Sequence, residues 1–457
     1  MRTLATYLVE ILHANGVEMV FGIPGVHTVE LYRGLGNSAI RHVTPRHEQG
    51  AGFMADGYAR VTGKPGVCFI ITGPGMTNIA TAMGQAHADS IPMLVISTVN
   101  SPGADAIEEA ASRLSVATRP LIVAGGGAKH GAASIRELAH RLNAPVMMTV
   151  NGRGILAGDD PLALPFSGEA PGVAGLICDA DVILALGTEL GPTDFWGTLP
   201  SRAQVDGWLI RVDLDPESVM RGILPDQPIL ADAAATAAGL AGHVQETRTA
   251  AENWGAMRVE KLRKSAVASM RPAFAAGLAA MDEIARAQPD TIIVGDSCQP
   301  AYAGCMAFGA PKPGSWFCSS TGFGTLGYGL PAAIGAALGA PDRPVCGLIG
   351  DGGIQFTLAE LGSATEAGTA MRMILWNNQG YQEIKRFMME CGIAPLGVDI
   401  FTPDFQAILA AYGWRYHRAG DLASLRELLA APAESNELIE IDEATFVASL
   451  NKMDNPD

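Results

Sequence analysis

The sequence of 457 residues has few charged residues, few aromatic residues and no long apolar run. Charged side chains make up 17% and hydrophobic ones 48%, a balance that excludes a disordered chain, because such chains are rich in charge and poor in apolar residues. No apolar run approaches the roughly 18–20 residues of a membrane span, so we expect no membrane partner. The formal net charge of −16 disfavours nucleic acid as a partner.

Paired cysteine motifs are also missing. The seven cysteines are odd in number and scattered, without the CxxC spacing of a metal or redox centre. This usage is typical of a reducing compartment. The first 18 residues carry Glu10 and His13 inside an apolar pattern, which predicts a folded helix and not a signal peptide. We therefore expect a cytoplasmic globular protein.

The order of the predicted elements repeats along the chain. Short apolar strands alternate with helices, and turns rich in glycine and proline separate them. This order predicts the α/β class, with three doubly wound domains on parallel sheets. At about 150 residues per domain, the length agrees with three domains. The expected bounds are 1–100, 103–245 and 272–457, with a linker helix over 246–271.

The strongest local signal is Gly350-Asp351-Gly352-Gly353, followed later by Asn378 in Trp376-Asn377-Asn378-Gln379-Gly380. Both segments follow predicted strands, and α/β sheets bind ligands where their strands end. The Asp351 carboxylate, the Asn378 amide oxygen and the Gly380 carbonyl are hard oxygen donors that suit Mg²⁺ or Ca²⁺ and leave positions for diphosphate oxygens. The three glycines around Asp351 let backbone N–H groups approach phosphates. The alternative is that residues 350–353 form only a tight turn after a buried strand. The presence of both segments disfavours this alternative.

These segments resemble the diphosphate and magnesium motif of thiamine-diphosphate enzymes, in the group of acetolactate synthases, benzoylformate decarboxylases and pyruvate decarboxylases. Three further segments agree in order: Arg46-His47-Glu48 with residues 49–60, Gly73-Pro74-Gly75-Met76-Thr77-Asn78, and Gly324-Thr325-Leu326-Gly327. Residues 46–79 and 380–388 are most similar to 5-guanidino-2-oxopentanoate decarboxylases.

The resemblance implies that thiamine diphosphate and Mg²⁺ are the cofactors. The three domains would then be pyrimidine-binding, central and diphosphate-binding, in chain order. Glu48 takes the place of the catalytic glutamate that hydrogen-bonds the pyrimidine ring, and Leu326 that of the apolar residue on which the cofactor folds. Other expected cofactor contacts are Gly25, Pro74, Asn78, Ser297, Gly324, Gly350, Gly352 and Gly353. Related enzymes form homodimers or homotetramers with their sites at subunit interfaces.

Three residues bear on the substrate. His27 stands in a loop that resembles the active-site entrance of benzaldehyde lyase, where it would move a proton or orient a carboxylate. The alternative for His27 is a loop histidine bonded to the backbone. Glu383 and Phe387 match positions that line the substrate pocket in related enzymes, and they predict a guanidinium held by a carboxylate over an aromatic floor. The alternative is a surface pair of Glu383 with Arg386, and the sequence leaves both open.

Evidence from the central domain is weaker. Gly125-Gly126-Gly127 follows a predicted strand but is not a GxGxxG motif. Val212-Asp213-Leu214-Asp215-Pro216 resembles the strand end that meets an adenine nucleotide in flavin-bearing relatives. The Arg-rich flavin segment of acetolactate synthases is not evident at residues 187–192, so FAD is doubtful.

The first predicted domain departs from the family after Asn100. Relatives have an active-site loop, several helices and a last strand here, whereas this chain passes directly into the first helix of the central domain. We therefore expect that the first domain lacks its C-terminal part. Losing a core strand exposes unpaired backbone and apolar surface. We favour a segment left out of this sequence over a true deletion.

Together these observations predict a thiamine-diphosphate- and Mg²⁺-dependent decarboxylase of a small-molecule 2-oxo acid. Its products would be an aldehyde and carbon dioxide, and 5-guanidino-2-oxopentanoate is the candidate substrate. One alternative is an acetolactate-synthase-like carboligase. Another is a catalytically silent structural subunit, against which the retention of Glu48, Asp351 and Asn378 argues.

Overall fold

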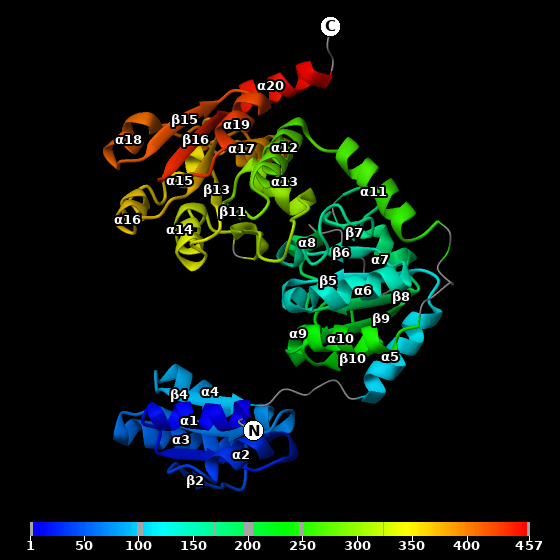
Figure 1. The fold of residues 1–457 in the computed structure, drawn as a ribbon, viewed down its shortest axis with the longest axis vertical. Helices are drawn as coiled ribbons and strands as arrows, with labels where there is room; N and C mark the ends of the chain where they lie inside the picture. The colour runs from blue at the N-terminus through cyan, green and yellow to red at the C-terminus, as the bar shows by residue number, and fades with distance from the viewer. Residues whose placement is uncertain are drawn as a thin grey trace. The chain divides into compact units, whose positions relative to one another are not determined.

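The computed structural model describes residues 3–97, 104–168, 170–195, 204–245, 251, 253–322 and 324–454. The chain divides into two compact units, Met1–Ser101 and Pro102–Asp457, which are treated separately below (Figure 1). The first unit holds one sheet and the second holds two, and the described strands pair in parallel throughout. The predicted α/β class with three parallel sheets is confirmed.

The sheet of the first unit has the order β2-β1-β3-β4. Its strands are β1 (Met19–Gly22), β2 (Arg41–Val43), β3 (Gly66–Ile70) and β4 (Met93–Ser97). Successive residues of a strand point to opposite faces, so Val20 and Phe69 pack with α1 (Leu4–Ala14) and α2 (Val29–Leu35). Phe21 and Cys68 pack on the other face with α3 (Glu48–Thr62) and α4 (Pro74–Ala88).

Strand β4 lies at the edge of this sheet. Its apolar side chains stay partly exposed, and Leu94 is 42% exposed. The expectation that a neighbouring segment is missing after Asn100 stays a prediction. Asn100 itself lies outside the described residues.

The second unit begins with a six-stranded sheet of order β10-β9-β8-β5-β6-β7. The strands are β5 (Pro120–Ala124), β6 (Val146–Met148), β7 (Ala163–Leu164), β8 (Val182–Leu186), β9 (Trp208–Asp213) and β10 (Gln227–Leu230). One face is covered by α5 (Ala104–Val116), α6 (Ala132–Leu142) and α10 (Ala233–His243), and the other by α7 (Gly175–Asp179) and α11 (Ala256–Ala268). Short helices α8 (Pro192–Phe195) and α9 (Pro216–Met220) follow β8 and β9.

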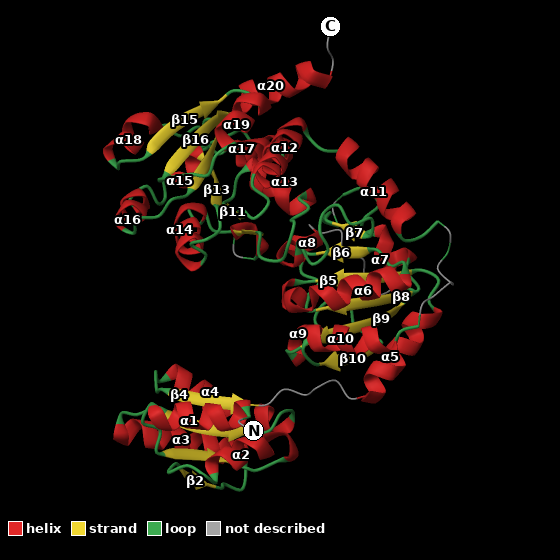
Figure 2. Cartoon of the chain, in the orientation of Figure 1, coloured by secondary structure: helices red, strands yellow, loops and turns green. Residues whose placement is uncertain are grey.

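The last sheet also has six strands, in the order β12-β11-β13-β14-β16-β15. The strands are β11 (Ile292–Gly295), β12 (Trp316–Cys318), β13 (Val345–Gly350), β14 (Arg372–Asn377), β15 (Arg415–Ala419) and β16 (Glu437–Asp442). Helices α12 (Pro272–Ala287), α13 (Gln299–Ala307), α19 (Leu422–Leu429) and α20 (Glu443–Asp454) pack on one face. Helices α14 (Gly329–Gly339), α16 (Glu360–Glu366) and α18 (Phe405–Ala411) pack on the other (Figure 2).

The predicted linker helix over 246–271 corresponds to α11, which is shorter than expected. Residues 246–250 and 252 lie outside the described part of the chain. Val259 and Leu262 of this helix are buried against the central sheet, and Arg263 donates to the carbonyls of Asp160 and Ala163. The helix is therefore packed onto the central domain and not suspended between domains. None of the helices in the described ranges has the length and apolar character that crossing a membrane requires.

Candidate active site

A cavity of about 330 Å³ lies at the carboxyl ends of β11, β13 and β14. Its lining includes ten residues that the sequence analysis singled out: Ser297, Gly324, Leu326, Gly350, Asp351, Gly352, Gly353, Asn378, Gly380 and Glu383. These residues come from four segments that are far apart in the chain. The parallel strand order brings them together because every strand of the sheet ends at the same edge.

Asp351 is the buried acid of this cavity. It follows β13 as the first residue of the short helix α15 (Asp351–Ile354) and is 1% exposed. Its carboxylate accepts N–H bonds from Asn378 at 3.3 Å and Gly380 at 2.9 Å, and a hydroxyl bond from Thr402 at 3.2 Å. Burial raises the pKa of Asp351 above its ordinary value, although these hydrogen bonds oppose the rise. A buried carboxylate whose described partners are neutral is suited to bind a cation.

The side chain of Asn378 is held in one orientation. Its amide nitrogen donates to Gln299 Oε1 at 2.9 Å and to Glu443 Oε2 at 3.2 Å. With the nitrogen used in this way, the amide oxygen is left to accept from another group. Gly380 adds a backbone carbonyl and has φ +127°, and a Cβ there would come within 2.6 Å of the Val398 carbonyl oxygen. Only glycine fits this position.

The donor set fits a magnesium–diphosphate pair. One carboxylate, one amide oxygen and one backbone carbonyl are hard donors of the kind that Mg²⁺ prefers. Within the described residues, no three His, Cys, Asp or Glu side chains gather to hold a metal by themselves. A cation beside Asp351 would therefore need further oxygens from a bound molecule, and a diphosphate supplies them.

Asp296 is a buried acid that the sequence analysis missed. It follows β11, has an exposed fraction of 0%, and accepts N–H bonds from Ser297 at 2.7 Å, Gly327 at 3.3 Å and Gly329 at 2.7 Å. Burial raises its pKa, and these backbone hydrogen bonds work against the rise. Asp296 thus ties the end of β11 to the loop that carries Leu326. An acid directly after an apolar strand was the available signal.

Glu383 lies in the first turn of α17 (Gln382–Glu390) and already has cationic partners. It accepts from Arg386, which is the surface pair that the sequence left open, and from Arg271 at 3.1 Å. Burial alone would raise the pKa of Glu383, but the hydrogen bonds and charges of Arg386 and Arg271 bring it below its ordinary value. Phe387, 59% exposed, lies one turn further along α17 and lines a second cavity together with Glu383.

In the first unit, Glu48 and Asn78 are in contact. Glu48 is the first residue of α3, and its Oε2 accepts from the Asn78 side-chain nitrogen at 2.9 Å. Pro74 begins α4, after Gly73 with φ +70°. A Cβ at Gly25 would come within 2.4 Å of Ile71 Cδ1, so the backbone is closely packed there. His27 is exposed in the turn after Gly25, and no bond from its ring to the backbone is among the described contacts.

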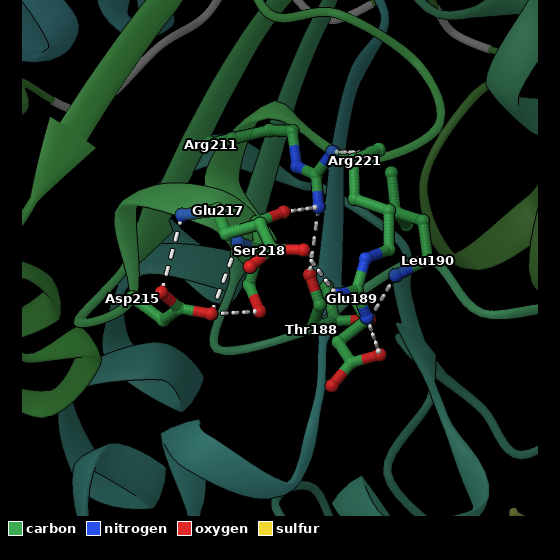
Figure 3. A network of polar contacts seen from close by, with 8 residues as sticks. All are labelled: Thr188, Glu189, Leu190, Arg211, Asp215, Glu217, Ser218 and Arg221. Atoms are coloured by element: carbon green, nitrogen blue, oxygen red, sulfur yellow. Dashed lines mark hydrogen bonds and ion pairs between the residues drawn. The ribbon is translucent and has the colours of Figure 1, made fainter. Parts of the chain in front are cut away.

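The corresponding edge of the central sheet is occupied by the chain itself. Arg211 on β9, 1% exposed, donates to the carbonyls of Thr188 at 3.2 Å, Ser218 at 2.8 Å, Ile223 at 3.2 Å and Arg221 (Figure 3). Asp215 caps α9 by accepting from the backbone of Glu217 and Ser218. Glu189 pairs with Arg221 at 3.2 Å. Arg211 and Asp215, at the end of β9, are thus bonded to neighbouring segments of the chain.

Comparisons with known proteins agree with this geometry. Three family models of thiamine pyrophosphate enzymes match the chain: the N-terminal TPP binding domain at residues 2–113, the central domain at 107–240 and the C-terminal TPP binding domain at 296–442. Thiamine pyrophosphate is another name for thiamine diphosphate. The chain belongs to the thiamine pyrophosphate enzymes, and the predicted family is confirmed.

Particular relatives cover nearly the whole chain. A protein named "Probable 2-ketoarginine decarboxylase AruI" from Pseudomonas aeruginosa is 40% identical, over 97% of this chain and 94% of the relative. The acetolactate synthase isozyme 1 large subunit of Escherichia coli is 28% identical, over 96% and 94%. A probable acetolactate synthase large subunit of Methanococcus aeolicus is 26% identical, over 98% and 93%. The alignment with the first relative spans 533 positions, more than the 457 residues of the chain, so the relative has residues without a counterpart here.

Proposed function

We propose that this enzyme decarboxylates a 2-oxo acid with thiamine diphosphate and Mg²⁺, and that the acid is 5-guanidino-2-oxopentanoate, also called 2-ketoarginine. The observation that carries the proposal is the cavity in which Asp351, Asn378 and Gly380 lie beside Glu383. It combines donors for a magnesium–diphosphate pair with an acid that can recognise a guanidinium. The relative from Pseudomonas aeruginosa, named as a probable decarboxylase of the same acid, supports the choice of substrate.

The diphosphate end of the cofactor is held by the second unit in this proposal. Asp351, Asn378 and the Gly380 carbonyl bind Mg²⁺, while the backbone at Gly350, Gly352 and Gly353 approaches the phosphates. Ser297, Gly324 and Leu326 line the same cavity and would complete the contacts with the cofactor. Asp296 acts as a positioning residue, because its three backbone hydrogen bonds hold the loop that carries Leu326.

The pyrimidine end is assigned to Gly25, Glu48, Pro74 and Asn78 of the first unit. When bound, thiamine diphosphate supplies the nucleophilic carbon that adds to the keto carbon and takes up the electron pair that carbon dioxide leaves behind. Glu48 holds a proton at the pyrimidine ring, and the bond from Asn78 at 2.9 Å fixes the orientation of its carboxyl group. His27 would orient the substrate carboxylate or return a proton to the product.

Replacing Glu48 tests this proton role. Glu48→Gln keeps the size of the side chain and its bond to Asn78 but cannot carry the proton. We expect turnover to fall by about 10²- to 10⁴-fold while cofactor affinity, measured by fluorescence titration, changes little. Near-normal turnover in this variant would remove Glu48 from the mechanism.

The substrate proposal is tested by measuring aldehyde and carbon dioxide release from a panel of 2-oxo acids. The purified protein, loaded with thiamine diphosphate and Mg²⁺, should prefer the guanidino acid to pyruvate and benzoylformate. Glu383→Gln should lower kcat/KM for the guanidino acid by about 30- to 1000-fold and leave pyruvate nearly unaffected, because only the guanidinium needs the charge. An equal loss for every acid would make Glu383 structural.

Carboligation is the second candidate. The relatives named as acetolactate synthases favour it, since their names record the synthesis of acetolactate and not a decarboxylation. The same panel distinguishes the two reactions, because a carboligase consumes pyruvate without releasing an equal amount of aldehyde.

We further propose a cytoplasmic homodimer or homotetramer with sites at subunit interfaces. All seven cysteines are free thiols in the structure, which supports a reducing compartment. The assembly is inferred from the family and is tested by sedimentation.

A further inference from the structure

Arg271 has the geometry that a bound guanidinium substrate would be expected to have. It is the residue before α12, and its guanidinium carbon lies 3.9 Å from the centroid of the Phe274 ring. Its two terminal nitrogens donate to Glu383, at 3.1 Å to Oε1 and 3.5 Å to Oε2. A planar cation that donates two bonds to one carboxylate while it lies over an aromatic face is the general pattern of guanidinium recognition.

The site of this contact adjoins the cofactor cavity. Arg271, Phe274, Tyr302, Glu383 and Phe387 line a cavity of about 420 Å³, which is large enough for a short side chain. Glu383 and Tyr302 also line the cavity that holds Asp351. The ring centroids of Phe274 and Tyr302 are 6.4 Å apart, and both rings line this cavity together with the Glu383 carboxylate.

The charges around Glu383 are balanced. Arg386 bridges Glu383 and Glu390, and Arg271 pairs with Glu383, so two cations meet two anions. A further guanidinium would bring an unmatched positive charge into this partly buried group. Its binding is therefore expected to require that one of the two arginines leaves.

Arg271 is the arginine that can leave more easily. Its side chain is 39% exposed and has one carboxylate partner among the described contacts, whereas Arg386 is held by two carboxylates. The Phe274 ring beneath it is only 7% exposed, so the aromatic surface stays in place when the arginine moves outward.

We propose that Arg271 is an internal stand-in for the substrate, which occupies the guanidinium subsite until the guanidinium of the 2-oxo acid displaces it. Arg271 is thereby a specificity-determining residue. A guanidino acid replaces the ion pair and the aromatic contact that it breaks, whereas an apolar acid gains nothing from Glu383 and therefore binds without displacing Arg271. This inference rests on the proposed substrate class, and it assigns a role to a residue that contacts Glu383 from 112 positions away in the chain.

The experiment measures binding and not turnover. The enzyme loaded with thiamine diphosphate and Mg²⁺ is titrated calorimetrically with two carboxylates of similar length. The first is 5-guanidinopentanoate, which lacks the reactive keto group, and the second is octanoate, which lacks the guanidinium. Arg271→Ala should tighten the guanidino ligand about 3- to 20-fold, because the ligand no longer competes with the arginine. Octanoate affinity should change less than about twofold.

Two further variants complete the test. Glu383→Gln should weaken the guanidino ligand at least about tenfold, and adding Arg271→Ala to it should restore no affinity, because the arginine acts through Glu383. Lys385→Ala is the matched control: it removes a positive charge from α17, where Lys385 pairs with Asp399 instead, and it should leave both affinities unchanged. Thermal unfolding verifies the fold, and Arg271→Gln replaces the alanine variant if that one does not fold.

The inference is overturned if Arg271→Ala weakens the guanidino ligand, tightens both ligands equally, or keeps its gain in the Glu383→Gln background. Weaker binding of both ligands would instead identify Arg271 as a binder of their shared carboxylate. A wild-type enzyme that releases carbon dioxide from no 2-oxo acid contradicts the proposed function. That result is distinct from the binding outcomes, which do not depend on turnover.

Discussion

The central and C-terminal sheets have the same number of strands and the same parallel pairing, yet their strand ends differ. At the C-terminal sheet, the segments after β11, β13 and β14 surround a cavity of about 330 Å³. At the central sheet, Arg211 bonds to the segments after β8 and β9. Gly127, after β5, donates its N–H to the carbonyl of Gly187, after β8, at 3.1 Å. The same architecture therefore produces a site in one domain and a packed edge in the other, and loop side chains decide which.

Glycines illustrate the difference. A Cβ at Gly125 would come within 2.2 Å of the Gly187 carbonyl oxygen, so this glycine permits two backbones to touch. A Cβ at Gly350 would meet nothing nearer than Cys298 Cβ at 3.5 Å, and at Gly324 nothing within 4 Å. Gly125 thus serves close backbone packing, whereas Gly350 and Gly324 leave open space beside the cavity. Gly352 of the same C-terminal turn is closely packed, because a Cβ there would come within 2.6 Å of Tyr381 Cε1.

The buried charges of Arg211 and Asp296 also differ in what they bind at the two sheet edges. Arg211 donates hydrogen bonds to backbone carbonyls at the end of the central sheet. Asp296 accepts hydrogen bonds from backbone N–H groups of a loop that lines the cavity. Burial lowers the pKa of Arg211 and raises that of Asp296. Each charge is tolerated because several hydrogen bonds replace its hydration.

The largest expected effect compares acids at the two edges. Asp351→Ala should lower thiamine diphosphate affinity about 100-fold or more, because it removes the charged ligand of the proposed cation. Asp215→Ala removes an acid at the central edge, where it only caps α9, so it should cost about 1 kcal/mol of local stability and leave cofactor affinity unchanged. Fluorescence titration of both variants measures the difference. If both variants lost thiamine diphosphate affinity equally, the proposal that only the C-terminal edge binds the cofactor would be contradicted.

Next in size is a comparison of glycines. Gly125→Ala should destabilise the fold by about 3 kcal/mol or more, because the new methyl group meets backbone that cannot move aside. Gly350→Ala should fold with a loss within about 1 kcal/mol, since its contacts are ordinary and its φ of −85° suits any residue. Denaturant unfolding without cofactor compares the two. A stable Gly125→Ala protein would show that the central edge is not tightly packed.

The smallest effect is a pH dependence at Asp296. Its folded pKa is raised by burial, so its contribution to stability is full below the unfolded pKa near 3.8 and is lost as the pH rises through the folded value. Asp296→Asn does not titrate and should be less stable than wild type because it loses acceptors. The difference in free energy of unfolding between wild type and this variant should narrow as the pH rises above about 4, measured by denaturant unfolding of cofactor-free protein. A deficit that widens with pH would contradict the assigned shift.

Local sequence was enough to predict the α/β class and the gathering of Asp351, Asn378 and Gly380. Each follows an apolar strand, and parallel strands that end at one edge bring the residues after them together. Glu48 and Asn78 were instead assigned from the resemblance to the family, and the structure joins them by a hydrogen bond. Reasoning from local sequence missed Asp296, because a single acid after a strand does not reveal which loops it will bind.

What the sequence determined by itself is the type of sheet, the ends of its strands and the residues at those ends, because strand periodicity and turn residues are local properties of the chain. Only the tertiary structure decided whether a strand end is open or filled, and which cation pairs with Glu383. Arg211 reaches Thr188 and Arg271 reaches Glu383 across long stretches of sequence. Such contacts depend on how whole elements pack, since a charged side chain takes the partner that folding brings within reach, and spacing along the chain does not encode that distance.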